Sequence, residues 1–190
     1  ENTQPALMAH SLAVIRILEN GGLKVGELAS HVAGHSLGEY SALASAGAFS
    51  VADAARLLKL RGQAMQRAVP VGEGAMAAIL GLSLEDVNAV VEEAAKGQVV
   101  VAANDNADGQ VVVSGDKAAV ERAIEIAKAK GAKRGLLLPV SAPFHCPLMK
   151  PAALEMKDAL ADVTIERPVV PVIANVLAAP VSEPEGIRNL

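Results

Sequence analysis

The hydrophobic and polar positions along this chain change their period several times, and each period predicts an element of secondary structure. Apolar residues at three- and four-residue spacing predict helices, and Ser, Asp or Gly marks where they start and stop. Helices are expected in the segment that ends at Gly21-Gly22 and over residues 39–46, 50–69, 83–95, 116–130 and 148–160. Short apolar or β-branched runs predict strands over residues 29–33, 75–80, 99–103, 110–113, 134–138 and 169–174.

The order of these elements predicts an α/β fold with two parts. Pro70 and the two glycines that follow it closely break the chain, and the next elements are strand, helix, strand, strand, helix, strand. That order is typical of the ferredoxin-like unit, and an Asn/Asp/Gly-rich turn would join its second and third strands. We therefore expect a ferredoxin-like small subdomain over residues 73–139, inserted into an α/β core formed by residues 1–72 and 140–190.

The composition is that of a globular protein, and it excludes some functions. Hydrophobic residues make up 52% of the 190 residues and charged residues 20%, so the chain can bury a core. Aromatic residues make up only 2%, with no Trp, and the formal net charge is −4. Neither a base-stacking surface nor a general polyanion-binding surface is predicted, so we expect no nucleic-acid partner.

The compartment and the chain ends can also be predicted. Cys146 is the only cysteine, which excludes an internal disulfide and favours a reducing compartment. No apolar run reaches membrane-spanning length and the N-terminus shows no signal-peptide pattern, so we expect a soluble cytoplasmic protein with no membrane partner. Glu1 enters directly into a helical pattern, and residues 184–190 resemble the start of another helix, so both ends are expected to be cut.

Residues 34–38, Gly-His-Ser-Leu-Gly, match the G-x-S-x-G pattern of a nucleophile elbow. An apolar run precedes them and a helical pattern follows, so a sharp strand-to-helix turn is predicted. We expect the turn to need glycine on both sides of Ser36, because neighbouring Cβ atoms would collide there. Ser36 would lie at a helix N-terminus, where the backbone N–H of Leu37 could stabilise an oxyanion. A turn that contains serine by chance is the alternative.

A serine hydroxyl needs a base to become a nucleophile, and the chain has four histidines. His10 lies on the first helix, His31 at a strand start, and His35 beside the serine, where support of the loop is favoured. His145 lies in a loop stiffened by three prolines, where a chain that returns to the elbow would bring a base. Arg61 is interpreted from the sequence alone as a solvated side chain, although an acyl group with a free carboxylate would need such a planar donor.

Three segments closely resemble the malonyl-CoA:acyl carrier protein transacylases and the acyltransferase domains of fatty-acid and polyketide synthases. They are residues 34–43 (GHSLGEYSAL), 61–66 (RGQAMQ) and 140–151 (VSAPFHCPLMKP), and they occur in the family's order. The resemblance covers essentially the whole chain. It implies an α/β-hydrolase-like acyltransferase core that moves malonyl from malonyl-CoA to the phosphopantetheine thiol of acyl carrier protein, in fatty-acid biosynthesis. Neither a bound cofactor nor a metal is implied, and we expect a monomer.

The resemblance also implies roles for individual residues. Ser36 would accept the acyl group, His145 would be its base, and Arg61 would hold the malonyl carboxylate. Leu37 would supply one amide of the oxyanion hole. Further substrate contacts are implied for His35, Met65 and Phe144. The Phe before the histidine resembles the malonyl-selective pattern rather than the methylmalonyl one.

Two parts of the family's pattern are missing from this sequence. In the family, a first strand and a Gly-Gln-Gly loop supply the second oxyanion amide, and a later segment orients the histidine. We therefore interpret the chain as the central part of a longer enzyme and leave open whether this piece is active alone.

Two other functions remain open. A serine esterase or thioesterase would use water as the acceptor and should have an acidic triad partner between Ser36 and His145 in chain order. Asp105, Asp108 and Asp116 lie in that interval, but within the predicted subdomain. The third hypothesis is an inactive fragment that docks carrier protein.

Overall fold

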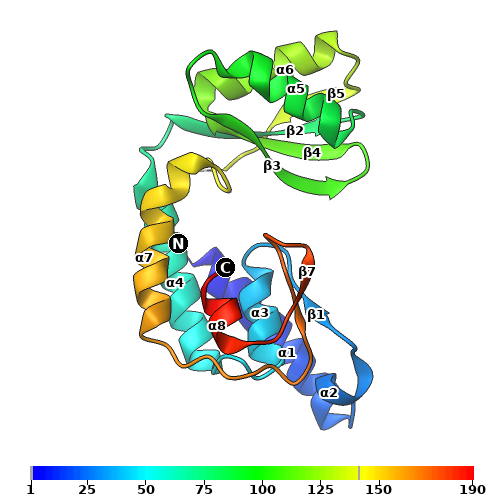
Figure 1. Cartoon of the computed structure of the whole chain (residues 1–190), viewed down its shortest axis with the longest axis vertical. Helices are drawn as coiled ribbons and strands as arrows, with labels where there is room; N and C mark the ends of the chain where they lie inside the picture. Colours follow the sequence, from blue (N-terminus) through cyan, green and yellow to red (C-terminus); the bar gives the residue numbers. More distant parts are fainter. Residues whose placement is uncertain (1, 141) are drawn as a thin grey trace. The chain divides into compact units, whose positions relative to one another are not determined.

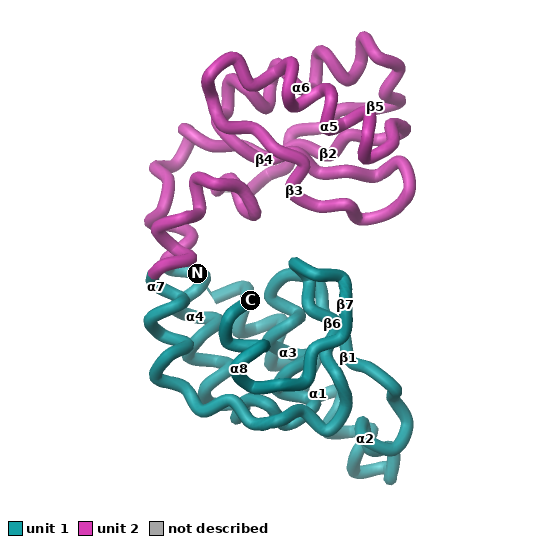
Figure 2. Tube along the Cα trace, viewed as in Figure 1, with its two compact units in different colours: residues 1–63, 155–190 teal, residues 64–154 magenta. Residues whose placement is uncertain are grey.

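The computed structural model describes residues 2–140 and 142–190, and the chain forms two compact units. Unit 1 comprises residues 1–63 and 155–190, and unit 2 comprises residues 64–154 (Figure 2). The boundaries predicted at residues 72/73 and 139/140 both lie inside unit 2. Helices and strands occur in both units, so the α/β class is confirmed.

Unit 1 contains a three-stranded sheet with helices around it (Figure 1). Strand β1 (Val32–Ala33) pairs in parallel with β6 (Val172–Ala174), and β7 (Ala179–Val181) pairs antiparallel with β6. The β-branched run after Pro168 therefore joins the same sheet as the strand before the elbow. The helices are α1 (Thr3–Asn20), α2 (Val25–Leu28), α3 (Gly38–Ser45) and α8 (Pro184–Arg188), with parts of α4 (Val51–Ala68) and α7 (Lys150–Ala161).

The core of unit 1 collects apolar side chains from α1, α3, α4, α7 and β6. Met8, Leu58 and Val172 are each at most 2% exposed. Helix α4 contributes at helical spacing, and its start is capped as predicted, because the Asp53 N–H donates to Ser50 Oγ at 3.0 Å. This cap and this apolar face fix α4 and hence the positions along it, including the one that carries Arg61.

Unit 2 contains a four-stranded antiparallel sheet in the order β3-β4-β2-β5. Figure 1 shows its two long helices on one face of that sheet. The elements are β2 (Gly74–Leu80), α5 (Leu84–Ala95), β3 (Val100–Ala107), β4 (Gln110–Asp116), α6 (Lys117–Ala129), β5 (Arg134–Leu137) and the 3₁₀ turn η1 (Pro147–Met149). The largest fully buried side chains between helices and sheet are Ile79, Val87, Val90, Val111, Val113 and Val120.

Several of the predicted strands have other lengths in the structure: β6 begins at Val172 rather than at residue 169, and β4 continues to Asp116 rather than ending at residue 113. The strand predicted over residues 29–33 was wrong in length, because β1 has only two residues. The turn predicted between residues 103 and 110 was too long. Strand β3 continues to Ala107, because it is an edge strand whose Asn and Asp side chains can face water, with two register shifts along it. Helix α2 and strand β7 were not predicted.

No helix within residues 2–140 and 142–190 combines the length and the apolar character needed to cross a membrane.

Candidate active site

The elbow at residues 34–38 joins β1 to α3 with very little chain. The Gly38 N–H donates to His35 O at 2.9 Å and the Glu39 N–H donates to Ser36 O at 3.1 Å, so the first helical turn starts on the elbow itself. Ser36 has a φ of 54°, in the left-handed region that residues other than glycine rarely adopt. Such strain in a non-glycine residue is typical of functional sites.

The structure requires only one of the two glycines that flank Ser36. A Cβ on Gly34 would lie 1.9 Å from Gly38 O, because the strand end and the helix start nearly touch there. A Cβ on Gly38 would meet nothing within 4 Å. The prediction that glycine is needed on both sides was therefore wrong for Gly38, which occupies an ordinary first helical position.

Arg61 lies next to the serine. Its Nη2 donates to Ser36 Oγ at 3.1 Å, and its Nη1 donates to Gln4 Oε1 at 2.6 Å. The guanidinium carbon lies 5.9 Å from the centroid of the Tyr40 ring, which itself stacks on Phe49. Helices α1, α3 and α4 thus converge to hold one cation against the serine hydroxyl, and the interpretation of Arg61 as a merely solvated side chain was wrong.

Burial sets the electrostatics around this cation. Burial lowers the pKa of Arg61, and the neighbouring Tyr40 and Glu39 oppose that shift. Burial also raises the pKa of the Glu39 carboxyl, against the opposing effects of the Asn175 N–H and of Arg61. A guanidinium cannot lose its proton in a protein, so Arg61 remains a partly desolvated cation whose five donors suit a planar anion such as a carboxylate.

Sequence reasoning missed two residues of this group. Gln4 lies in the first turn of α1 and bonds Arg61 across 57 positions of sequence. Asn175 follows β6 and bonds the elbow at two points, Ser36 N–H and Gly34 O, and the Glu39 side chain at a third. The signal in the sequence was the place of Asn175 directly after a predicted strand, because the carboxyl ends of adjacent parallel strands place their next residues together.

The candidate base lies in unit 2, in the loop before η1. His145 is exposed and has a φ of 58°, so it shares with Ser36 an unusual left-handed backbone. The loop is held on both sides: Cys146 Sγ donates to Pro143 O at 3.1 Å, and a Cβ on Gly74 would lie 2.3 Å from the Pro143 ring. Ser141, within the same predicted loop, lies outside the described residues.

Two further predicted site residues belong to one apolar cluster of unit 2. Met65 is 8% exposed and packs among Val69, Met149 and their neighbours, and Phe144 packs against the same cluster while remaining half-buried. His35, in unit 1, is exposed, and its carbonyl supports the first turn of α3. The structure thus brings Ser36 and Arg61 together, and it brings Phe144 and Met65 together.

The pairing of Ser36 with His145 joins two units and stays a prediction. Of the other histidines, His10 is exposed on α1, and His31 forms a hydrogen bond with the neighbouring Ser30 hydroxyl.

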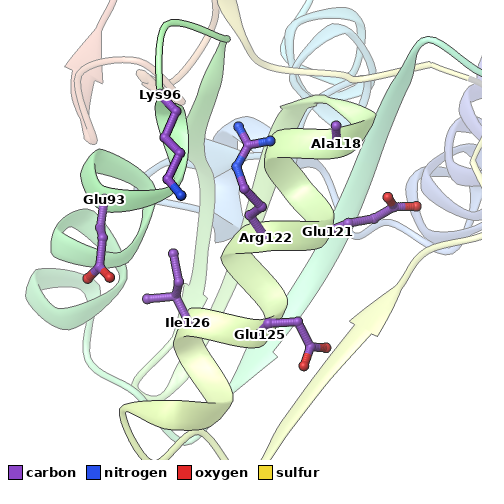
Figure 3. Close-up of a pocket in the computed structure, with 7 residues that line it drawn as sticks. All are labelled: Glu93, Lys96, Ala118, Glu121, Arg122, Glu125 and Ile126. Atoms are coloured by element: carbon purple, nitrogen blue, oxygen red, sulfur yellow. The ribbon is translucent and has the colours of Figure 1, made fainter.

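A surface pocket of unit 2 lies between α5 and α6, and Figure 3 shows Arg122 reaching into it from α6. Arg122 Nη2 donates to Ala94 O at 2.8 Å and to Ala95 O at 3.1 Å, so this cation closes the C-terminal end of α5. The remaining lining has both signs of charge: Glu93, Lys96, Ala118, Glu121, Glu125 and Ile126. None of the predicted site residues lines the pocket, and we assign it to the surface of the fold.

Comparisons with known proteins agree with the motifs. The family model for the acyl transferase domain matches residues 1–187. The malonyl CoA-acyl carrier protein transacylase of Escherichia coli strain K12 is 51% identical over 187 residues, which are 98% of this chain and 60% of that protein. The protein of the same name from Bacillus subtilis is 47% identical over 99% of this chain and 58% of its own length.

Solved structures show the same fold. The acyl-carrier-protein-S-malonyltransferase of Bartonella henselae superposes with a TM-score of 0.96 at 57% identity, over 99% of this chain and 60% of that one. A chain from the structure of a type II PKS acyl-carrier protein in complex with its malonyl-transacylase matches with a TM-score of 0.94 at 48% identity, over 98% of this chain and 60% of that one. The chain spans about 60% of the length of these curated relatives. On the family match over nearly all its residues, this chain belongs to the acyl transferase domain family.

Proposed function

We propose that this protein transfers a malonyl group from malonyl-CoA to the phosphopantetheine thiol of acyl carrier protein, through a malonyl ester on Ser36. The observation that carries the proposal is the hydrogen bond of 3.1 Å from Arg61 Nη2 to Ser36 Oγ, at a strained elbow. A serine nucleophile serves any acyl transfer, whereas a half-buried cation beside it favours an acyl group with its own negative charge. The names of the relatives support the same substrate and acceptor.

In the proposed mechanism, His145 removes the proton of Ser36 as Oγ attacks the thioester carbonyl of malonyl-CoA. The N–H of Leu37, at the start of α3, donates to the oxyanion of the tetrahedral intermediate. When the intermediate collapses, the C–S bond breaks and His145 returns the proton to the thiol of coenzyme A. The thiol of the carrier protein then attacks the malonyl-serine by the same steps in reverse order.

Arg61 binds the free carboxylate of the malonyl group throughout both half-reactions. In the absence of substrate the guanidinium donates to Ser36 Oγ and to Gln4. The malonyl carboxylate would replace Ser36 Oγ as its acceptor when malonyl-CoA binds, while Gln4 keeps the guanidinium in place. Phe144, His35 and Met65 are proposed as further substrate contacts, with the half-buried Phe144 ring limiting branching at the α-carbon.

For the architecture, we propose an α/β-hydrolase-like core formed by residues 1–72 and 140–190 and a ferredoxin-like subdomain over residues 73–139. The antiparallel order β3-β4-β2-β5, with α5 and α6 on one face, supports the second assignment. The strand-to-helix elbow after β1 supports the first.

The proposed partner is an acyl carrier protein, and the proposed setting is the cytoplasm, with the protein acting as a monomer and with neither a bound cofactor nor a metal. The matched complex of a malonyl-transacylase with an acyl-carrier protein supports the partner. The single cysteine, Cys146, supports a reducing compartment.

The experiment is acyl-enzyme mapping. The protein is incubated with labelled malonyl-CoA, and the label is located by peptide mass analysis, with Ser36→Ala as the test variant. Ser45→Ala is the matched control, because it removes a hydroxyl from α3, the short helix that follows the elbow. We expect label on the peptide of Ser36 in the parent protein and the control, and none in Ser36→Ala, since loss of a serine nucleophile costs about a million-fold in rate. Label that persists in Ser36→Ala would contradict the proposal.

The acceptor distinguishes transfer from hydrolysis. Release of the label should require the thiol form of acyl carrier protein and yield malonyl-carrier protein. Release as free malonate, at the same rate without carrier protein, would instead identify a thioesterase.

A further inference from the structure

We infer that Asn175 is the positioning residue of the nucleophile: its side-chain amide takes the place of a β-strand peptide and holds Ser36 in its strained conformation. Asn175 Oδ1 accepts the Ser36 N–H at 2.7 Å, and Asn175 Nδ2 donates to Gly34 O at 2.7 Å. No other orientation of this amide satisfies both elbow groups, because one is a donor and the other an acceptor.

The two elbow groups are those that a continuing parallel strand would use. In a parallel pair, a residue donates its N–H to the carbonyl of the residue that precedes its opposite neighbour. Its own carbonyl accepts from the N–H of the residue that follows that neighbour. Val32 and Ala33 of β1 pair in this way with Val172 and Ile173 of β6. If the pairing continued, Gly34 O and the Ser36 N–H would be the next two groups of this strand to bond the backbone of the strand beside it. Both are bonded instead by the side chain of Asn175.

Because the Asn175 side chain takes over these two hydrogen bonds, the chain can turn while its backbone groups remain satisfied. If β1 continued as a strand, Ser36 would be extended and its hydroxyl would lie in the sheet. At a φ of 54°, the backbone leaves the sheet and enters α3, and its polar groups would otherwise lose their partners. The amide supplies those partners at the point of the turn, which stabilises a conformation that the backbone alone disfavours.

Asn175 is itself fixed from the helix side. Its own backbone N–H donates to Glu39 Oε2 at 3.1 Å, and Glu39 lies in the first turn of α3. The end of β6, the elbow and the start of α3 are therefore tied through one residue. Because Asn175 bonds the Ser36 N–H, that N–H is not available to an oxyanion, and the Leu37 N–H is the elbow amide left for that role.

The direct test is amide hydrogen exchange at Ser36, which does not depend on any enzymatic activity. In the parent protein we expect the Ser36 N–H to be protected. In Asn175→Ala, protection should fall by about three- to ten-fold, the effect of one lost hydrogen bond. A second variant, Asn175→Asp, introduces a charge, and Asn88→Asp on the exposed face of α5 is the control for that charge change.

Asn175→Asp sharpens the test, because it keeps the shape and the acceptor but loses the donor to Gly34 O. Ser36 protection should be reduced when the new carboxylate is ionised and should recover as the pH falls and the carboxyl gains a proton that it can donate. Equal protection of Ser36 in the parent protein and in Asn175→Ala, both folded by circular dichroism, would overturn the inference. Protection of the Ser36 N–H in Asn175→Asp that does not change with pH would also overturn it.

A second readout rests on the proposed function. The rate constant for acylation of Ser36 by malonyl-CoA should fall about ten- to hundred-fold in Asn175→Ala, because a small displacement of a nucleophile is costly. The KM should stay nearly constant, since Arg61 and Gln4 are untouched; a change in KM alone would overturn a positioning role. If malonyl-CoA acylates none of the proteins while Ser36 exchange still responds to Asn175, the proposed function fails and the inference stands.

Discussion

The two units of this chain achieve order in different ways. Unit 2 has strands of four to eight residues and two helices whose apolar faces are buried against the sheet. Unit 1 has strands of two and three residues, and its elbow is held by side-chain hydrogen bonds. Unit 2 is therefore a scaffold that local periodicity determines, whereas the conformation of Ser36 in unit 1 depends on a few polar contacts between residues far apart in sequence.

The helices show the same difference. Helix α6 buries Ala119, Val120, Ala123 and Ala127 completely on one face. Helix α1 buries only Met8, although it is apolar on more than one side. Leu7, Val14, Ile17 and Leu18 are between 43% and 70% exposed. Burial, rather than apolar content, decides how much each residue contributes to stability, and this difference can be tested by substitution.

The largest effect should come from Gly34→Ala in unit 1. The new methyl group would lie 1.9 Å from a backbone oxygen, which no rotamer change can relieve. We expect a loss of about 4 kcal/mol or more in the free energy of unfolding, or failure to fold. Gly38→Ala is the matched control and should be neutral or stabilising by up to about 1 kcal/mol, because the site is open and helical. Denaturant unfolding measures both, and equal losses for the two variants would contradict the elbow geometry.

The next effect should come from the scaffold of unit 2. Ile79 is fully buried between the sheet and its helices, so Ile79→Ala should lower the free energy of unfolding by about 2–5 kcal/mol. Ile17→Ala is the control on α1, where the side chain is 70% exposed, and should change it by no more than about 0.5 kcal/mol. A cost for Ile17→Ala as large as that for Ile79→Ala would remove the distinction between the buried sheet of unit 2 and the exposed face of α1.

Phe144 tests whether a residue packed in unit 2 also selects the substrate. One methyl group in an apolar pocket changes discrimination by only about 1–3 kcal/mol. Phe144→Ser should therefore raise the methylmalonyl-to-malonyl ratio of kcat/KM by roughly ten-fold or more. An unchanged ratio in a variant that melts normally would make Phe144 a packing residue alone.

The smallest effect should be the pH dependence contributed by Glu39. Burial raises the pKa of this carboxyl above its ordinary value of 4.5, so the folded protein binds the proton more tightly than the unfolded chain does. That contribution to stability is present below the ordinary pKa and is lost as the pH rises through the folded pKa. Glu39→Gln should thus be more stable than the parent protein at neutral pH, with the difference shrinking on acidification. Melting temperatures of both proteins between pH 4 and pH 7 measure this difference. If Glu39 were instead stabilised as a carboxylate, Glu39→Gln would be less stable than the parent protein at pH 7.

The sequence allowed unit 2 to be predicted more fully than unit 1. Helices α5 and α6 begin within one residue of the predicted starts, and the Ser83 side chain caps α5, accepting the Asp86 N–H at 3.1 Å. Such signals are local, because a cap and an apolar face involve residues a few positions apart. The end of β3 was misjudged because Asn104 and Asp105 favour turns by type, whereas an edge strand accepts them.

In unit 1 the motif was visible but its supports were not. Gly-x-Ser-x-Gly locates the elbow, since the turn itself limits which residues fit. The contact of Arg61 with Gln4 and that of Ser36 with Asn175 join residues 57 and 139 positions apart, and no periodicity encodes such pairs. The sequence therefore predicted the position of the elbow, but only the structure reveals the residues that bond to it.

The central claim is that the cation beside Ser36 selects acyl groups with a carboxylate, and the most direct measurement compares two substrates in one variant. Rates of Ser36 acylation by malonyl-CoA and by acetyl-CoA are measured in the parent protein, in Arg61→Ala and in Arg61→Lys. Because a charged hydrogen bond contributes about 1.5–3 kcal/mol, Arg61→Ala should slow malonyl transfer by about one to two powers of ten and leave acetyl transfer unchanged or faster. Arg61→Lys should restore malonyl transfer only in part, since an ammonium lacks the planar pair of donors. Equal losses for malonyl and acetyl groups in Arg61→Ala would show that Arg61 only supports the fold of the site, and would contradict the account.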